Sequence, residues 1–299
     1  MIAAIDIGSN AIRLLIKDES APDFLLHLDE VAPHEYYERV PLKSGMDVFE
    51  HGQILPKTEL VLTAAMIRFA ALMQQHGVGA YRACATSAYR DAANGAEVMV
   101  RVNAASGLNV EIIPGAEEAR VTRCSYQVPA QWQDDALMFV DVGGGSTEVS
   151  LLIGGEEKYS HSFQIGSMRY LCGIQDSAQE QMLDQTIIDI ARTYGRVHYL
   201  GVGGCVKFMN KYLNGKREGN TIRVEEMQAV YEDLKTKSVD EIVEAYSLPH
   251  ERADILTPAS SIFLRIAHNV GATEITVPSI GVRNGILTEL FRQKTVADF

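Results

Sequence analysis

The sequence predicts an α/β protein built from two like-folded lobes, and three observations support this expectation. Segments typical of strands and of helices alternate along the chain. A strand, a turn with Asp and Gly, and a second strand occur near the start and again in the middle of the chain. The length of 299 residues exceeds the ~100 to 200 residues of one domain. We therefore expect duplicated lobes around a cleft that binds the ligand.

In the first half, strands are expected over residues 2–7, 11–17, 79–85 and 109–113, with a further strand ending near residue 40. Helices are expected over residues 56–75, 91–106 and 117–126. The first of these helices begins with Pro56, which suits a first helical turn. Its apolar positions recur at helical spacing, namely Leu60, Thr63, Ala64, Ile67 and Ala71.

A polar connection over residues 128–135 separates the halves, and we place the domain boundary there. The expected domains are residues 1–128 and 129–299, with a last helix at about 281–295 that is a candidate to pack back on the N-terminal lobe. The second half should contain strands over 136–140, up to 153, over 158–163 and over 197–202. A helix is expected over 178–194, and helices from residue 203 to the end.

The duplication can be followed residue by residue. Residues 5–10, followed by the strand 12–16, run parallel to residues 140–145, followed by the strand 147–151. A second correspondence joins residues 81–85, which lead to Thr86-Ser87, with residues 198–202, which lead to Gly203-Gly204. Repetition of a hairpin and a βα unit is what an internally duplicated α/β fold produces.

Composition excludes several classes of protein. The first residues lack a basic region followed by an apolar stretch, and no run approaches the ~18 apolar residues of a membrane span. Four separated cysteines without a C-x-x-C pair argue against zinc and disulfides, so a reducing cytoplasm is expected. The net charge of −12 argues against nucleic acid and acidic membranes as partners. A bound polyanion then needs a locally positive pocket made of amides, arginines and cations.

The strongest chemical signal is Asp141-Val142-Gly143-Gly144-Gly145-Ser146-Thr147-Glu148. Three glycines after an apolar strand allow a turn whose amides point inward and bind an anion. Asp141 and Glu148 could face this turn and provide the oxygen ligands that Mg²⁺ prefers. The structural alternative is a glycine hairpin with solvated acids, and the related copy at Asp6-Ile7-Gly8-Ser9-Asn10 argues against it.

Several segments together carry a resemblance to one family. They are Asp6-Ile7-Gly8-Ser9-Asn10, Ala85-Thr86-Ser87-Ala88-Tyr89-Arg90-Asp91, Gly115-Ala116-Glu117-Glu118-Ala119-Arg120 and residues 141–148. In this order they resemble the exopolyphosphatase and guanosine pentaphosphate phosphohydrolase (Ppx/GppA) family, and the resemblance extends through residues 252–254 and 281–285. It implies the actin, Hsp70 and sugar-kinase superfold, with two duplicated ribonuclease-H-like lobes. That superfold hosts many functions, so the fold alone does not define one.

The resemblance implies roles for individual residues. Glu118 matches the catalytic carboxylate that orients and deprotonates the attacking water, with Glu117 the weaker candidate. From the helix dipole alone, both would be solvated acids of a first helical turn. Arg90 matches a phosphate-contacting arginine, because a guanidinium engages two phosphate oxygens at once. Arg120 is expected to be structural.

By the same resemblance, Asp6, Asp141 and Glu148 hold Mg²⁺, with Mn²⁺ as the alternative ion, and the last two of these acids also belong to the catalytic set. The implied phosphate-binding residues are Ser9, Asn10, Arg90, Gly143, Gly144, Gly145, Ser146, Gly203 and Gly204. Cys205 stands where the family commonly has a hydroxyl residue, which would remove a phosphate donor.

The leading hypothesis is a Mg²⁺-dependent phosphohydrolase that removes terminal phosphate from short inorganic polyphosphate or from guanosine pentaphosphate. Longer family members carry an additional HD-type domain for long chains, and this chain is expected to have the two lobes alone. One alternative is a small-molecule kinase, whose ATP consumption would depend on an added acceptor. The other is a non-catalytic protein that binds polyphosphate or guanosine tetraphosphate or pentaphosphate without turnover. A homodimer is expected by analogy with the family.

Overall fold

The computed structural model describes residues 1–21, 23–28, 30–215 and 219–297. The chain divides into two compact units, residues 1–126 with 280–299 and residues 127–279. The boundary predicted between residues 128 and 129 lies two residues from this division. The C-terminal helix belongs to the first unit, although the chain before it belongs to the second. Each unit is described separately below.

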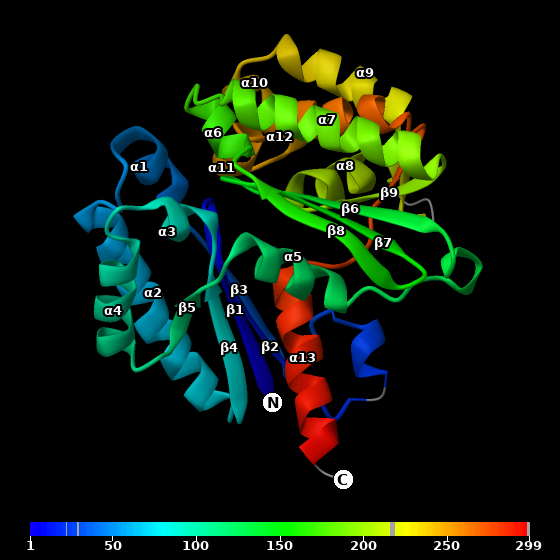
Figure 1. The fold of residues 1–299 in the computed structure, drawn as a ribbon. Coiled ribbons are helices and arrows are strands. Elements are labelled where there is room, and N and C mark those ends of the chain that lie inside the picture. Colours follow the sequence, from blue (N-terminus) through cyan, green and yellow to red (C-terminus); the bar gives the residue numbers. More distant parts are fainter. Residues whose placement is uncertain (22, 29, 216–218, 298–299) are drawn as a thin grey trace. The chain divides into compact units, whose positions relative to one another are not determined.

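The N-terminal unit contains a five-stranded sheet with the order β3-β2-β1-β4-β5 (Figure 1). Its strands are β1 (Ile2–Ile7), β2 (Ala11–Lys17), β3 (Tyr36–Pro41), β4 (Ala80–Ala85) and β5 (Val110–Ile112). Strands β1, β2 and β3 form an antiparallel meander, whereas β4 and β5 run parallel to β1. The helices are α1 (Ser44–His51), α2 (Pro56–Gln75), α3 (Ser87–Asp91), α4 (Gly95–Ser106), α5 (Gly115–Cys124) and α13 (Val282–Ala297).

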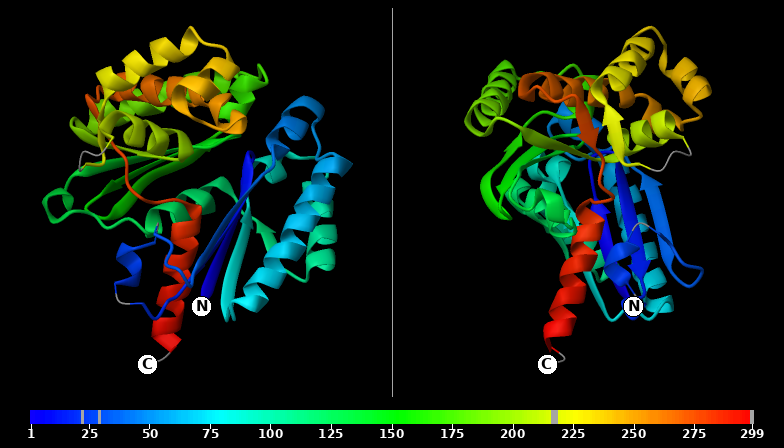
Figure 2. Two further views of the ribbon diagram at one scale, coloured as in Figure 1. Left: turned by 180° about the vertical axis from the view of Figure 1, so that it is seen from behind. Right: turned by 90° about the vertical axis from the view of Figure 1, so that its right-hand side faces the viewer.

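Helices cover both faces of this sheet. Helices α2 and α4 lie side by side on one face, and α13 lies on the other face against β1, β4 and α5 (Figures 1 and 2). Strand β1 is central, so its apolar residues are buried on both sides. The first residues of α13 complete the core beneath α5, because Val282, Ile286 and Leu287 pack with Ile2 and Val121.

Helix α2 spans the predicted residues but buries a different face. Its buried side chains are Leu62, Ala65, Met66, Phe69 and Met73. The positions first used to identify the helix are outside the core: Leu60 is 71% exposed and Ile67 is 48% exposed. Apolar residues occur on nearly every side of this helix, and the stripe with the larger side chains packs on the sheet because it removes more apolar surface from water.

The C-terminal unit contains a six-stranded sheet with the order β10-β11-β9-β6-β7-β8. Its strands are β6 (Ala136–Val142), β7 (Thr147–Ile153), β8 (Glu156–Phe163), β9 (Val197–Val202), β10 (Thr221–Arg223) and β11 (Glu274–Thr276). The helices are α6 (Ser167–Leu171), α7 (Ser177–Tyr194), α8 (Gly204–Asn214), α9 (Val224–Lys235), α10 (Val239–Tyr246), α11 (His250–Ala253) and α12 (Leu256–Val270). The fully buried Phe263 anchors α12 in one continuous core.

The two sheets confirm the predicted α/β class and the duplication. Strands β6, β7, β8, β9 and β11 have the order and relative directions of β1, β2, β3, β4 and β5. Strand β10 is an addition at the edge of the second sheet. The expectation of helices alone after residue 203 was therefore wrong. Strands β10 and β11 are three residues each, too short for a period of two to stand out in the sequence.

Three short helices, α1, α3 and α6, were not predicted, and the helix predicted over residues 91–106 begins later. Helix α3 ends at Asp91, and α4 begins at Gly95. The Asn94 side chain between them accepts a hydrogen bond from the amide of Ile54 at 2.9 Å and donates one to its carbonyl at 2.9 Å. This contact with residue 54 fixes the break between α3 and α4. The local sequence pattern cannot predict it, because the two residues are 40 positions apart. None of the described helices is long and apolar enough to cross a bilayer.

Candidate functional site

In the N-terminal unit, the predicted phosphate loop of Gly8, Ser9 and Asn10 joins β1 to β2. Ser9 is 3% exposed, and its hydroxyl oxygen lies 2.9 Å from that of Ser87 at the start of α3. The Asn10 carbonyl accepts a hydrogen bond from the Leu42 amide at 3.3 Å. The Ser9 side chain therefore ties the loop to the end of β4.

Asp6, predicted to be a metal ligand, forms an ion pair across the hairpin. Arg13 lies directly opposite it on β2, and Nη1 of Arg13 donates to Oδ2 of Asp6 at 3.0 Å. The two side chains are 13% and 27% exposed, respectively. The negative charge of Asp6 is thus already compensated within its own hairpin.

Glu118 and Arg90, predicted from different motifs, lie together. Nη1 of Arg90 donates to Oε2 of Glu118 at 2.8 Å and to the carbonyl oxygen of Ile113 at 2.8 Å. Glu118 is in the first turn of α5, and the backbone amide of Glu118 donates to the Pro114 carbonyl at 3.0 Å. The two side chains are 13% and 16% exposed. Arg90 therefore holds the carboxylate at the junction of β5 and α5, where water can still reach it.

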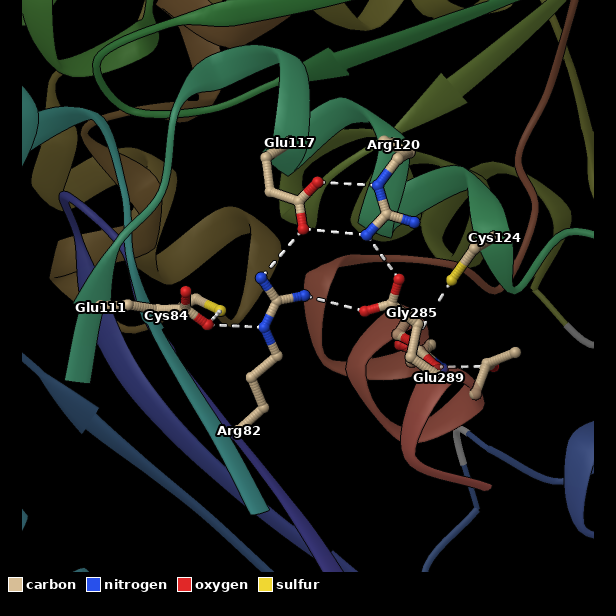
Figure 3. A network of polar contacts seen from close by, with 10 residues as sticks. Arg82, Cys84, Glu111, Glu117, Arg120, Cys124, Gly285 and Glu289 are labelled. Carbon is tan, nitrogen blue, oxygen red and sulfur yellow. Dashed lines mark hydrogen bonds and ion pairs between the residues drawn. The ribbon is translucent and has the colours of Figure 1, made fainter. Parts of the chain in front are cut away.

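The neighbouring Glu117 has a different environment. It accepts two hydrogen bonds from Arg120, at 2.7 and 2.9 Å, and one from Arg82 at 2.9 Å (Figure 3). The hydrogen bonds from Arg120, then those from Arg82, outweigh partial burial and lower the pKa of Glu117 to about 2. Such an acid is a poor proton acceptor near neutral pH. Arg120 has the structural role predicted for it, since it also binds Glu289 on α13 at 2.5 Å.

In the C-terminal unit, Asp141 and Glu148 occupy the same hairpin positions as Asp6 and Arg13. They are directly opposite each other on β6 and β7, so their side chains share one face. Glu148 is 3% exposed, and its Oε1 accepts a hydrogen bond from Ser162 on β8 at 2.7 Å. Two acidic residues thus face each other in this hairpin, whereas an acidic residue, Asp6, faces the cationic Arg13 in the first hairpin.

The glycine turn between these strands is held from one side. The carbonyl of Gly143 accepts from the Ser167 amide at 3.0 Å, and that of Gly144 accepts from the Met168 amide at 2.8 Å. Nε of Arg169 donates to the carbonyl of Gly145 at 2.6 Å. The start of α6 and this arginine thereby bind the turn's carbonyls and fix its backbone.

Gly203 and Gly204 connect β9 to α8. Gly203 has a backbone φ of 114°, which residues with a side chain rarely adopt. A Cβ at this position would lie 3.4 Å from Oδ1 of Asp141. The second predicted phosphate loop and the Asp141 carboxylate are therefore neighbours within one unit. The Cys205 side chain points elsewhere: Sγ lies 3.8 Å from the Leu256 carbonyl oxygen and 3.7 Å from Oγ of Ser260, both buried contacts.

Three of the four cysteines have thiols of raised pKa. All four are free thiols. Burial raises the pKa of Cys84 and of Cys205 to about 12 and that of Cys124 to about 11. These three side chains therefore remain protonated near neutral pH, as expected of core cysteines.

The donor set suits one kind of metal site. Two facing carboxylates, together with substrate oxygens and water, are the ligands that Mg²⁺ commonly uses in phosphate-binding sites. Among the described residues, no group of three or more His, Cys, Asp or Glu side chains is arranged to hold a metal ion. Asp141 and Glu148 thus fit a hard cation that binds together with a phosphate substrate.

Several residues that contact the predicted site residues were not identified from the sequence. Arg13 could have been found from the hairpin register, since it is as far from the turn as Asp6. Arg169 and Ser162 carry no local signal, because their contacts with Gly145 and Glu148 depend on how β8 and α6 pack. Ser87 lies in a segment that was recognised, but its contact with Ser9 spans 78 positions.

Known proteins resemble this chain in sequence and in fold. Curated relatives include exopolyphosphatase 1 of Mycobacterium bovis, 26% identical over 56% of this chain and 47% of the relative. Exopolyphosphatase 2 of Mycobacterium tuberculosis is 34% identical over 56% of this chain and 53% of the relative. The chain thus spans about half the length of the curated relatives it matches.

Solved structures match over nearly the whole chain. An exopolyphosphatase from Cytophaga hutchinsonii superposes with a TM-score of 0.81 at 20% identity, and an Aquifex aeolicus Ppx/GppA protein superposes with 0.74 at 21% identity. Each comparison covers 98% of both chains. At these identities the match concerns the fold.

The fold defines a duplicated α/β protein in which each half carries a strand–turn–strand hairpin with an aspartate near the end of its first strand. The sequence profile described as the Ppx/GppA phosphatase family matches residues 37–294. The chain belongs to this family.

Proposed function

We propose that the protein is a phosphohydrolase that cleaves the terminal phosphoanhydride bond of polyphosphate by attack of water. One observation carries the proposal: Glu118 is held at the start of α5 by Arg90 at 2.8 Å and is only 13% exposed. A carboxylate fixed beside a guanidinium combines a base for water with a cation for phosphate oxygens. Membership of a phosphatase family and the exopolyphosphatase relatives support the same activity.

In this proposal, Glu118 accepts a hydrogen bond from the attacking water and takes its proton as the bond to phosphorus forms. Arg90 shifts part of its hydrogen bonding from Glu118 to the phosphate, which frees the carboxylate when substrate is present. Amides of the turn at Gly144 and Gly145 bind the transferred group, because the carbonyls are held by α6 and Arg169. The Gly143 amide donates to the Ser146 carbonyl at 2.9 Å and closes the hairpin, so the predicted phosphate contact of Gly143 is replaced by this bond. Such preorganised donors cost no reorganisation during the reaction.

We propose Mg²⁺, with Mn²⁺ as the alternative, as the cation held by Asp141 and Glu148. When bound, it would neutralise negative charge on the phosphate oxygens. Ser162 orients Glu148 through a hydrogen bond of 2.7 Å. A direct role for Asp6 would require it to exchange its ion pair with Arg13, so its part in cation binding stays a prediction.

The proposed substrates are short polyphosphate chains and guanosine pentaphosphate. The net charge of −12 disfavours long polyanions that must lie along the protein surface, and a short chain brings less negative charge to that surface. A cytoplasmic location and a homodimer stay predictions from the sequence.

The decisive experiment measures phosphate release from defined short polyphosphates and guanosine pentaphosphate with Mg²⁺. Glu118→Gln should lower kcat by about 10³-fold, a typical contribution of a general base, while the variant stays folded. Glu97→Gln on the exposed face of α4 is the matched control, because its carboxylate is 77% exposed, and it should retain wild-type turnover. Unchanged turnover in Glu118→Gln would remove Glu118 from this role. ATP consumption that requires an added acceptor would instead indicate a kinase, and tight binding without turnover would indicate a binding protein.

A further inference from the structure

A group of charged residues joins four elements of the N-terminal unit, and the proposed reaction does not use it (Figure 3). At its centre is Arg82 on β4. Its guanidinium contacts three carboxylates: Glu111 on β5 at 2.6 Å, Glu117 on α5 at 2.9 Å and Glu289 on α13 at 2.8 Å. We call these residues, with Arg120, the Arg82 network.

Arg120 closes the network. It binds both oxygens of Glu117 and contacts Glu289 at 2.5 Å, so Glu117 and Glu289 are each bridged by two arginines. Arg82 is 22% exposed, Glu289 17% and Glu117 26%. Bridged and half-buried pairs of this kind resist solvent screening better than isolated surface pairs. The hydrogen bonds also outweigh the burial of Arg82 and keep its pKa above the ordinary value.

The network lies where α5 and α13 are in backbone contact. A Cβ placed on Gly285 of α13 would lie 1.8 Å from the carbonyl oxygen of Val121 on α5, so only glycine allows this approach. Sγ of Cys124 on α5 donates to the Gly285 carbonyl at 3.3 Å. Helix α5 is thus held at its first turn by Arg82 and along its length by α13.

We propose that Arg82 is a positioning residue for Glu118, which rests on the proposed function of Glu118. Glu117 and Glu118 are consecutive in the first turn of α5, so fixing the side chain of one fixes the rotation of the helix that presents the other. Side-chain ends lie roughly 5 to 6 Å from a helix axis, so a rotation of about 10° moves a carboxylate by about 1 Å. A displacement of that size can cost about 10²-fold in rate.

The test compares Arg82→Met and Arg82→Lys with the wild-type enzyme on a short polyphosphate with Mg²⁺. Arg82→Met should lower kcat by about 10- to 100-fold and leave KM within about 2-fold, because Arg82 positions the base and does not touch substrate. Arg82→Lys should recover part of kcat, since an ammonium retains the charge but cannot bridge three carboxylates. The acid limb of the kcat–pH profile should move to higher pH in Arg82→Met, because Glu117 beside Glu118 loses part of its compensating charge.

Arg265→Met in the other unit is the matched control. Arg265 binds Asp184 at 2.8 and 2.6 Å and Glu180 at 2.8 Å and is 30% exposed, so its loss breaks a comparable network. It should reduce stability as Arg82→Met does and leave kcat and the pH profile unchanged. An equal fall in kcat in both variants would mean that Arg82 acts through stability alone and would overturn the proposal, as would wild-type kcat in Arg82→Met.

A second measurement does not depend on activity. Amide hydrogen exchange of residues 115–120 should become at least about 10-fold faster in Arg82→Met and stay unchanged in Arg265→Met. Unchanged protection of this segment in Arg82→Met would overturn the proposal even if the wild-type protein released no phosphate. The proposed function is tested separately, by phosphate release from the wild-type protein and by the Glu118→Gln variant.

Discussion

At the scale of single residues, two consecutive glutamates have different physical roles. Glu117 is bound by two arginines, and its pKa lies at about 2, below its ordinary 4.5. Glu118 instead accepts a hydrogen bond from Arg90 at 2.8 Å. The helix dipole would favour both acids equally at this helix start. Their distinct partners, and not their position in the helix, separate a structural acid from the candidate base.

This difference predicts how stability depends on pH. Because the folded-state pKa of Glu117 is depressed, ionised Glu117 stabilises the fold above about pH 4.5, and that contribution is lost as pH falls toward 2. Glu117→Gln should therefore cost about 1 to 3 kcal/mol at pH 7. The difference between variant and wild type should shrink between pH 4.5 and 2, as measured by urea denaturation. A difference that is constant over this range would contradict the assignment.

Cys205 provides a second prediction for a single residue. The sequence indicates a lost phosphate donor, but the thiol faces Leu256 and Ser260 in the core. A serine in its place would meet the same buried partners. Cys205→Ser should therefore leave KM for polyphosphate within about 2-fold and change stability by about 1 kcal/mol or less. A KM lowered 5-fold or more would show that a hydroxyl here reaches the substrate.

At the scale of elements, the two hairpins share a backbone and differ in charge. Asp6 faces Arg13 in the first, whereas Asp141 faces Glu148 in the second. Facing acids repel each other unless a cation lies near them. Binding of a cation should therefore depend more on Asp141 and Glu148 of the second hairpin than on Asp6 of the first.

Asp141→Asn should raise the Mg²⁺ concentration for half-maximal activity by about 10-fold or more, as loss of one of two carboxylate ligands predicts. Asp6→Asn serves as the comparison, and its effect should be smaller because Arg13 already neutralises Asp6. The stabilisation of each variant by Mn²⁺ in a thermal unfolding assay gives a measure that is independent of turnover. An equal or larger effect of Asp6→Asn on both measures would reverse the assignment of the principal ligands.

Elements also show what the sequence could predict. The strands and the helix over residues 56–75 follow from apolar runs and helical spacing, which are local properties. The face that α2 buries does not, because apolar residues on several sides leave the choice to the sheet it meets. The site divides in the same way: Glu118 and Arg90 lie in recognisable motifs, whereas Arg82 became informative only through contacts that span 29 to 207 positions.

At the scale of the whole molecule, the duplication could be predicted from the sequence. The packing of the last helix on the N-terminal unit was only a candidate there, and it is the structure that describes this packing. Helix α13 supplies Val282, Ile286 and Leu287 to the core of the N-terminal unit, although the residues before 280 belong to the other unit. The first unit is therefore complete only when both ends of the chain are present. Its core therefore includes side chains of the C-terminal helix.

This arrangement predicts selective effects on the two units. Ile286 is fully buried in α13, and Ile286→Ala should cost about 2 to 5 kcal/mol through lost burial and a residual cavity. The cost should appear in the unit that contains Cys84, which is 0% exposed and becomes reactive toward a thiol reagent when that unit opens. Trp132, the single tryptophan, stacks on His198 with ring centroids 4.2 Å apart and reports on the other unit by fluorescence.

Ile286→Ala should therefore lower the denaturant concentration at which Cys84 reacts and shift the Trp132 transition less. Ile187→Ala in α7 is the matched control, because Ile187 is equally buried in the C-terminal unit, and it should have the opposite pattern. Coincident shifts of both probes in both variants would mean that the units unfold as one cooperative structure. Separate shifts would mean that a core built from both chain ends can open independently, and the Arg82 network would then loosen together with α13, because Glu289 is one of its anchors.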